Sequence, residues 1–353
     1  MSLDEWRSRI NNLDNQILNL LTQRAEAALH IGDLKRQNGL PAYAPEREMD
    51  VLRRLQAANT SPLPFEAVRA IWREILSGCR ALEQPTTVAY FGPAATFTHQ
   101  AAIAQFGDST EYVARRTVAD VFDDVERART DWGVVPVENT TGGAVNATLD
   151  RLVETDALVC GEIRLEIAQQ LLSRARDLSE VKRVLSHPQG LAQCQHWLAA
   201  NLPNAVTQET TSTAAAVEVA ATDPSVAAIS SDLAGRLYGV PVLRANIEDE
   251  IGNATRFLVI GRRAVGPTGH DKTSILFAMR NEPGSLYRIL EPMARLGINL
   301  TKIESRPAPR QPWEYVMFVD FEGHRDVDPA ATALKEIGER ALLVKVLGSY
   351  PAA

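Results

Sequence analysis

Apolar residues recur in alternating steps of three and four along the start of the chain. The stripe includes Ile10, Leu13, Ile17 and Leu20 and continues beyond residue 30. That period predicts one continuous helix over residues 2–37. Such a helix is about 50 Å long at a rise of 1.5 Å per residue. A region of about 84 residues cannot bury it along its whole length, so we predict that the excess packs on a second copy of the chain.

Two shorter helices follow in the same region. Gly39 and Pro41 end the first helix, and Pro45 begins a second over about 45–59. The prolines of segment 61–64 break the chain again before a third helix over 65–83. Residues 1–84 therefore read as an all-α domain of three helices.

The rest of the chain has a different texture. Over residues 86–263, short apolar runs such as TTVAYFG and TRFLVIG alternate with helical stretches, which predicts an α/β domain of βα units around mainly parallel sheets. The stretch AVGPTGHD has the composition of a linker. Residues 272–350 read β-α-β-β-α-β, with one strand over 313–322, which is the α+β ferredoxin-like plan.

Composition excludes several classes of protein. The 353 residues carry a formal net charge of −7, which argues against a general binder of nucleic acids or anionic membranes. The three cysteines are far apart, which argues against a disulfide framework and indicates a reducing compartment. The start of the chain does not resemble a signal peptide, and no apolar run approaches a membrane span. Without metal-ligand spacing or a nucleotide loop, the sequence predicts a cytoplasmic protein that needs no cofactor and no metal.

Charged residues interrupt the apolar faces of the three helices. Arg24 stands where the stripe predicts a hydrophobic residue, and Lys35 follows on the same face eleven residues later. Glu48 and Glu83 lie on the apolar faces of the second and third helices. A buried charge needs a partner or a ligand. The spacing alone leaves both open: salt bridges between helices, or a site for an ionic ligand.

The charged pattern resembles the all-helical chorismate mutases. The match comprises Trp6-Arg7, Leu13-Asp14, Leu20-Leu21, Arg24, Gly32, Lys35, Arg47-Glu48, Cys79 and Glu83. The resemblance implies an intertwined dimer that rearranges chorismate to prephenate. It also implies these substrate-binding residues: Arg7, Arg24, Lys35, Arg47, Glu48, Cys79 and Glu83.

The roles that the resemblance implies suit the chemistry. Arginines clamp the two carboxylates of the substrate, and Lys35 and Glu83, as catalytic residues, flank the ether oxygen on which negative charge develops. Glu48 takes the substrate hydroxyl. Arg7 lies about 100° from the face of Arg24, so it is expected to act on the partner chain's site. Ala44 and Cys79 depart from relatives that have an acid and a serine there.

Polar clusters in the central region, taken together, resemble the prephenate dehydratases. The segments VENTTGG and NATRF are the most specific, although singly such clusters are more often helix caps. The resemblance implies two lobes like those of periplasmic binding proteins, with the site between them. It implies these binding residues: Thr96, Glu138, Asn139, Ser212, Thr213, Thr255 and Arg256.

Dehydration of prephenate releases carbon dioxide and water as the ring becomes aromatic. The reaction needs a hydrogen-bonding acid near the leaving hydroxyl and a weakly solvated pocket for the carboxylate. Thr255 is the leading candidate for that acid, or for a group that orients it, because an unperturbed hydroxyl is a very weak acid. Arg256 is either a carboxylate partner or a structural residue.

In the last region, the segment NEPGSL over residues 281–286 joins the first strand to its helix, and ESRP over 304–307 ends the second strand. In position these two loops resemble the ligand loops of ACT domains, which bind amino acids. In dehydratases of this kind the ligand is phenylalanine, acting as an allosteric inhibitor. Tyr287 is larger than the residue that relatives often carry in this turn. The resemblance implies these effector-binding residues: Asn281, Pro283, Gly284, Ser285, Leu286, Asn299, Glu304, Ser305 and Arg306.

The three resemblances occur in one order along nearly the whole chain. They imply a bifunctional enzyme of phenylalanine biosynthesis, a homodimer or a higher oligomer, with chorismate and prephenate as substrates and phenylalanine as inhibitor. Two alternatives stay open: a dehydratase whose helical domain only dimerises, and a non-catalytic sensor of amino acids.

Overall fold

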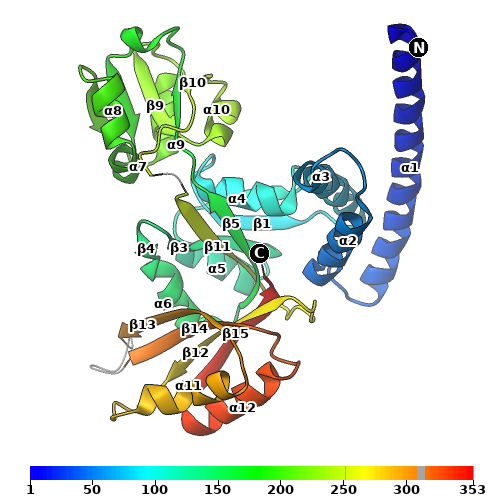
Figure 1. Cartoon of the computed structure of the whole chain (residues 1–353), viewed down its shortest axis with the longest axis vertical. Coiled ribbons are helices and arrows are strands. Elements are labelled where there is room, and N and C mark those ends of the chain that lie inside the picture. Colours follow the sequence, from blue (N-terminus) through cyan, green and yellow to red (C-terminus); the bar gives the residue numbers. More distant parts are fainter. Residues whose placement is uncertain (251, 308–314, 353) are drawn as a thin grey trace. The chain divides into compact units, whose positions relative to one another are not determined.

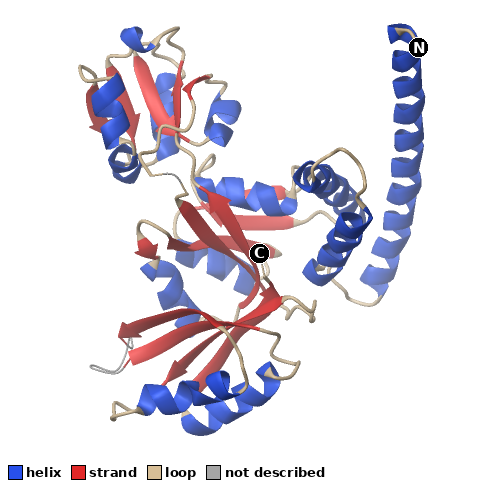
Figure 2. Cartoon of the chain, in the orientation of Figure 1, coloured by secondary structure: helices blue, strands red, loops and turns tan. Residues whose placement is uncertain are grey.

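The computed structural model describes residues 1–250, 252–307 and 315–352, so the first two residues of the strand expected over 313–322 lie outside the described residues. The chain forms two compact units. One contains Met1–Thr87 with Gln105–Glu111, and the other contains the rest of the chain. Figure 1 labels the elements of both units, and Figure 2 shows that the first is built of helices and the second of sheets with helices.

The helical unit contains the three expected helices. They are α1 (Leu3–Gln37), α2 (Pro45–Ala58) and α3 (Phe65–Glu83). Ser2 caps α1 in a capping box with Glu5, which explains why the helix begins there. Only Ala28 and Gly32 of α1 are buried, and the stripe of Trp6, Ile10, Leu13 and Ile17 is exposed.

The short segment 105–111 packs with the helices, although the sequence assigns it to the central region. Glu74 accepts a hydrogen bond from the backbone N–H of Asp108 at 2.9 Å, and Ser77 accepts one from Ser109 at 3.1 Å. Gly107 has a φ of +75°, and a Cβ there would lie 2.5 Å from Ser77, so this turn requires glycine.

The first lobe of the second unit contains a six-stranded sheet with the path β2-β1-β3-β11-β5, and β4 pairs with β3. Its strands are β1 (Thr87–Phe91), β2 (Glu111–Arg115), β3 (Trp132–Asn139), β4 (Gly143–Ala144), β5 (Leu158–Glu166) and β11 (Ala254–Gly261). Its helices are α4 (Phe97–Phe106), α5 (Val118–Glu126) and α6 (Asn146–Glu154).

The prediction of mainly parallel sheets is wrong for this lobe. The chain leaves the lobe after β5 and returns as β11, which inserts between β3 and β5 and is antiparallel to both. Residues far apart in the sequence thereby become cross-strand neighbours, and Thr255 pairs with Asn139. The sequence shows the strands but not the direction in which the chain re-enters a sheet.

The second lobe has a five-stranded sheet in the order β10-β6-β9-β7-β8. Its strands are β6 (Gln170–Ser173), β7 (Arg183–Ser186), β8 (Val206–Glu209), β9 (Val226–Ser230) and β10 (Val242–Arg244). Its helices are α7 (Pro188–Gln193), α8 (Gln195–Asn201), α9 (Thr213–Ala220) and α10 (Asp232–Tyr238), with a 3₁₀ turn over Leu178–Glu180. Here β7 is parallel to β8 and β9, whereas β6 is antiparallel to its neighbours.

The C-terminal region confirms the ferredoxin-like plan. Its sheet has the order β13-β14-β12-β15, and α11 and α12 lie on one face of it (Figure 1). The strands are β12 (Asp271–Ala278), β13 (Leu300–Pro307), β14 (Tyr315–Glu322) and β15 (Leu343–Pro351), and the helices are α11 (Ser285–Arg295) and α12 (Ala330–Arg340).

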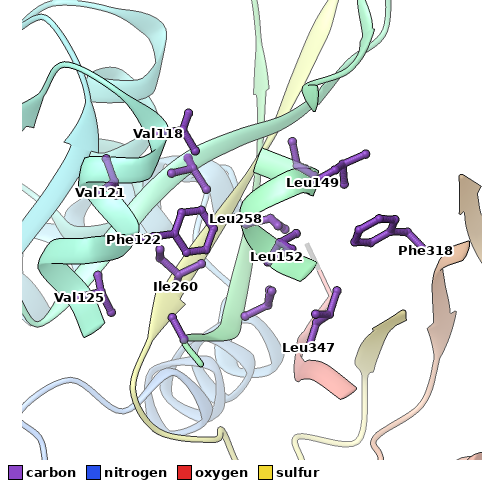
Figure 3. Packing of buried hydrophobic residues seen from close by; sticks show 14 of the residues in the cluster. Val118, Val121, Phe122, Val125, Leu149, Leu152, Leu258, Ile260, Phe318 and Leu347 are labelled. Atoms are coloured by element: carbon purple, nitrogen blue, oxygen red, sulfur yellow. The ribbon is translucent and has the colours of Figure 1, made fainter. Parts of the chain in front are cut away.

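One hydrophobic core joins this sheet to the first lobe. Leu258 of β11 belongs to the same buried cluster as Phe318 of β14 and Leu347 of β15 (Figure 3). A Cβ on Gly348 would lie 2.0 Å from the carbonyl oxygen of Val159, so β15 touches the backbone of β5 directly. Burial of this apolar surface holds the C-terminal sheet against the first lobe.

Candidate active sites

The charged residues of the helices gather at one end of α1. Lys35 donates hydrogen bonds of 2.7 Å to Oε2 of Glu83 and to the carbonyl oxygen of Ala42. An ammonium group has three N–H donors. The described residues accept from two of them, which leaves the third for a ligand. A Cβ on Gly32 would lie 2.9 Å from the Cα of Glu83, so glycine at this position lets α3 approach α1 and brings the carboxylate to the lysine.

A second ion pair lies close to the first. Arg80 donates a hydrogen bond to Glu48 and another to the carbonyl oxygen of Phe106. Burial raises the pKa of the Glu48 carboxyl, although Arg80 and Lys35 both favour its charged form. The structure thus brings Lys35, Glu48 and Glu83 together.

Sequence reasoning missed Arg80, which is 4% exposed. Its guanidinium also lies over the ring of Tyr43. The available signal was a cation four residues after Leu76, in line with the apolar face of the helix. Arg80 holds Glu48 in place, so part of the expected ligand site is also a salt bridge between helices.

Among the described residues, no side-chain hydrogen bond or ion pair joins the other mutase-type candidates to this cluster. Arg24 is half-buried on α1, Arg47 is exposed on α2 and Cys79 is buried on α3. Arg7 is exposed and lies 3.4 Å from Asp4. Because α1 is one continuous helix, Arg7 lies about 25 Å along its axis from Arg24.

In the first lobe, Asn139 organises a second cluster, made of neutral groups. Its amide Oδ1 accepts hydrogen bonds from the backbone N–H groups of Thr141 and Gly142, at 2.9 and 2.8 Å, which fixes the orientation of the amide. Its Nδ2 therefore donates to Oγ1 of Thr255 at 2.8 Å and to Oδ1 of Asn253 at 3.0 Å. A hydroxyl that accepts from Asn139 keeps its own hydrogen for another acceptor.

Asn253 begins the NATRF segment but is not among the binding residues that the sequence predicts. Its Oδ1 also accepts hydrogen bonds from the hydroxyls of Thr140 and Thr141, at 3.0 and 3.3 Å. Its position in the same short segment as Thr255 was the available signal. The VENTTGG and NATRF segments therefore meet in space, although they are more than 100 residues apart.

The remaining dehydratase-type candidates have other partners. Thr96 donates a hydrogen bond to the carbonyl oxygen of Pro93 at 3.0 Å, and Ser212 caps α9, where Thr213 is the first residue. Glu138 pairs with Lys302 at 2.9 Å. Arg256 pairs with Glu162 at 2.7 Å and with Asp320 at 2.5 Å, so its guanidinium does not lie with Thr255.

The effector-type candidates occupy the C-terminal module. Gly284 has a φ of +76° at the start of α11, a conformation that favours glycine, and Ser285 is buried behind it. Asn299 donates a hydrogen bond to Glu322 at 3.0 Å, and Arg306 of β13 pairs with Asp150 of α6 at 2.7 Å. Asn281 and Pro283 lie in the same turn, Leu286 lies in the first turn of α11, and Glu304 and Ser305 lie on β13.

Among the described residues no group of histidine, cysteine and acidic side chains could hold a metal ion. None of the described helices combines the length and apolar character that crossing a membrane requires.

Comparison with known proteins gives three family matches and close relatives. The family models are chorismate mutase type II over residues 6–84, prephenate dehydratase over 88–265 and the ACT domain over 273–339. A protein of Aquifex aeolicus (strain VF5), named bifunctional chorismate mutase/prephenate dehydratase, is 47% identical over 355 residues, which cover 99% of this chain and 98% of the relative.

Two solved structures resemble most of the chain. One is a prephenate dehydratase in complex with L-Phe from Arthrobacter aurescens, with 32% identity and a TM-score of 0.70 over 76% of this chain and 90% of that one. The other is the quorum quenching acylase GqqA, with 28% identity and a TM-score of 0.69 over 76% of this chain and 98% of that one.

Proposed function

Because the chain belongs to the family of bifunctional chorismate mutases/prephenate dehydratases, we propose that it performs both reactions at separate sites. Residues 1–84 rearrange chorismate to prephenate, residues 86–263 convert prephenate to phenylpyruvate, and residues 272–350 sense phenylalanine. The observation that carries this proposal is the presence of two unlike clusters, one of ion pairs around Lys35 and one of neutral groups around Asn139.

In the proposed mutase site, the substrate is held as a dianion by Arg24, Arg47 and the partner chain's copy of Arg7. The rearrangement breaks a C–O bond and forms a C–C bond, and negative charge develops on the ether oxygen. The third N–H of Lys35 is aimed at that oxygen and stabilises the transition state more than the ground state. Glu83 holds the lysine, and the free oxygen of Glu48 accepts the substrate hydroxyl.

In the proposed dehydratase site, Thr255 donates a hydrogen bond to the leaving hydroxyl of prephenate. Its oxygen already accepts from Asn139, which directs its own hydrogen away from that amide. The C–C bond to the ring carboxylate breaks and releases carbon dioxide, and its electron pair forms the aromatic ring as the C–O bond to the hydroxyl breaks. The hydroxyl leaves as water with a proton that is drawn from solvent. Thr96, Ser212 and Thr213 complete the cleft, while Glu138 and Arg256 support it from behind.

We propose a homodimer built through α1. The apolar stripe of α1 is about half exposed, with 47% for Trp6, 54% for Ile10 and 48% for Leu13, which is unusual for a stripe of this length. A second copy of α1 would cover the stripe and bring its Arg7 to the site that Arg24 serves. We further propose a cytoplasmic location, in keeping with three free cysteines.

One assay tests the function. When the protein is mixed with chorismate, the diene absorbance of chorismate should fall and phenylpyruvate should then form. Added phenylalanine should slow the formation of phenylpyruvate. Production of phenylpyruvate from prephenate without any loss of chorismate would indicate that the helical domain only dimerises. Binding of phenylalanine with neither reaction would indicate a sensor.

A further inference from the structure

Two neighbouring cross-strand pairs join β3 and β11. Thr255 lies opposite Asn139, and Arg256 lies opposite Glu138. Successive side chains of a strand point to opposite faces, so the first pair serves the candidate site and the second points away from it. The first pair is joined by the 2.8 Å hydrogen bond, and Arg256 lies 3.9 Å from Glu138 in the second.

Two residues of the C-terminal sheet bind the second pair, one on β3 and one on β11. Lys302 of β13 binds Glu138 at 2.9 Å, and Asp320 of β14 binds Arg256 at 2.5 Å. Lys302 and Asp320 are themselves cross-strand partners. One pair of the C-terminal sheet therefore holds one pair of the catalytic sheet, directly behind Asn139 and Thr255.

The surroundings make this contact stiff. Glu162 binds both Arg256 and Lys272, at 2.7 and 2.6 Å. The hydroxyl of Tyr350 accepts a hydrogen bond from Arg256 and shares another with Ser274. Buried charges that are fully paired move only together, because separating one from its partner leaves it unpaired at low dielectric.

We propose that Lys302 and Asp320 are positioning residues for the dehydratase reaction: through Glu138 and Arg256 they set the spacing of Asn139 and Thr255. The inference rests on the proposed dehydratase function. It gives the C-terminal module a part in catalysis itself, because the hydroxyl of Thr255 depends on ion pairs that this module supplies.

The same contact offers a route for the effector. Lys302, Glu304 and Arg306 alternate with exposed residues on β13, so they share one face. Arg306 also contacts the first lobe, through Asp150. A ligand that contacts Glu304 acts between two residues that hold the catalytic lobe. Its binding energy can therefore shift Lys302, and with it the pair behind Thr255.

The test compares Lys302→Met with Lys335→Met in the full chain. Both changes remove one lysine charge from the C-terminal module, but Lys335 is exposed on α12. We expect Lys302→Met to lower dehydratase kcat about tenfold with KM unchanged, because positioning matters most in the transition state. The factor by which phenylalanine lowers the dehydratase activity should be at least fivefold smaller in this variant than in the wild type. Mutase activity and phenylalanine affinity, measured by calorimetry, should match those of Lys335→Met.

A second variant guards against a trivial loss of structure. Asp320→Asn keeps the shape of the side chain and one acceptor for Arg256, and it should reproduce the pattern of Lys302→Met. If Asp320→Asn fails to fold, the result for Lys302→Met is sufficient to test the inference. Glu138, the partner of Lys302, is 40% exposed, so its carboxylate can be solvated when the lysine is removed.

Two results would overturn the inference, and they differ. Wild-type protein that does not consume prephenate would remove the proposed function and the inference with it. Active wild-type protein with a Lys302→Met variant that behaves like Lys335→Met, or that loses phenylalanine affinity in parallel with inhibition, would remove the inference alone.

Discussion

The candidate site of the helical unit is made of charged side chains. The candidate site of the first lobe is made of neutral side chains, and the charged residues next to it form ion pairs elsewhere. Lys35, Glu83, Glu48 and Arg80 form paired ions between helices. At the junction of β3 and β11, Thr255 accepts a hydrogen bond from the amide of Asn139, while the adjacent Arg256 pairs with Asp320 of the C-terminal sheet.

The proposed reactions explain the difference. In the rearrangement, negative charge grows on the ether oxygen, so a fixed cation stabilises the transition state. In the dehydration the carboxylate loses its charge as carbon dioxide departs. A cation beside that group would stabilise the ground state more than the transition state and would slow the reaction. An Arg256 that is held by Asp320 and Glu162 cannot do so.

The largest effect should come from the neutral site. Thr255→Ala removes the hydrogen-bond donor to the leaving hydroxyl and should lower dehydratase kcat by about 10²- to 10⁴-fold. Chorismate consumption should not change, because the two sites share no residue. Thr255→Ser keeps the hydroxyl and should retain most of the activity. Equal losses in the alanine and serine variants would show that Thr255 acts through packing.

The charged site should give the reverse pattern. Lys35→Met removes the cation at the ether oxygen and should lower mutase kcat by about 10²- to 10³-fold. Dehydratase activity on added prephenate should stay at the wild-type level. A folded Lys35→Met protein that loses both activities would contradict the two-site comparison.

The two sites also differ in how far the sequence predicts them. The three helices follow from apolar period and proline positions. The charges on the apolar faces mark Lys35 and Glu83, although the spacing leaves open whether they form a salt bridge or bind a ligand. Local rules of this kind are sufficient for a helical hairpin.

The neutral site depends on long-range topology. The sequence indicates β11 as a strand but not that it inserts antiparallel between β3 and β5, and this insertion pairs Thr255 with Asn139. Strand alternation then separates Arg256 from Thr255, a separation that a motif of adjacent letters hides. Arg80 was missed for a related reason, since its two partners, Glu48 and Phe106, come from distant segments.

A further contrast is that the charged site should require two chains. Arg7→Ala and Arg24→Ala chains should each be defective in mutase activity alone. After mixing in equal amounts under conditions that allow exchange, half of the dimers are mixed and each has one intact site. Mutase activity should therefore recover to about a quarter of the wild-type value. Absence of recovery after proven exchange would argue against a site shared across α1.

The smallest expected effect concerns the pH dependence of the free energy of unfolding that the carboxyl of Glu48 produces in the helical unit. Burial raises the pKa of the Glu48 carboxyl above the ordinary value of 4.5, against the opposing effect of Arg80. A raised pKa in the folded state means that the folded state binds the proton more tightly than the unfolded chain does. This contribution to stability is fully present below pH 4.5 and is lost as the pH rises through the raised pKa.

Glu48→Gln removes that titration, so the comparison of urea midpoints isolates it. Followed by the helical circular dichroism of the full chain, the midpoint of the wild type minus that of Glu48→Gln should fall as the pH rises from 4.5 towards neutrality. Glu46→Gln, in the first turn of the same helix, controls for the loss of a carboxylate from α2. A difference that rises with pH would mean that the ion pair with Arg80 outweighs burial, and Glu48 would then be chiefly a structural partner of Arg80. A falling difference would mean that the fold tolerates an unfavourable carboxylate there, as expected of a residue kept for its substrate.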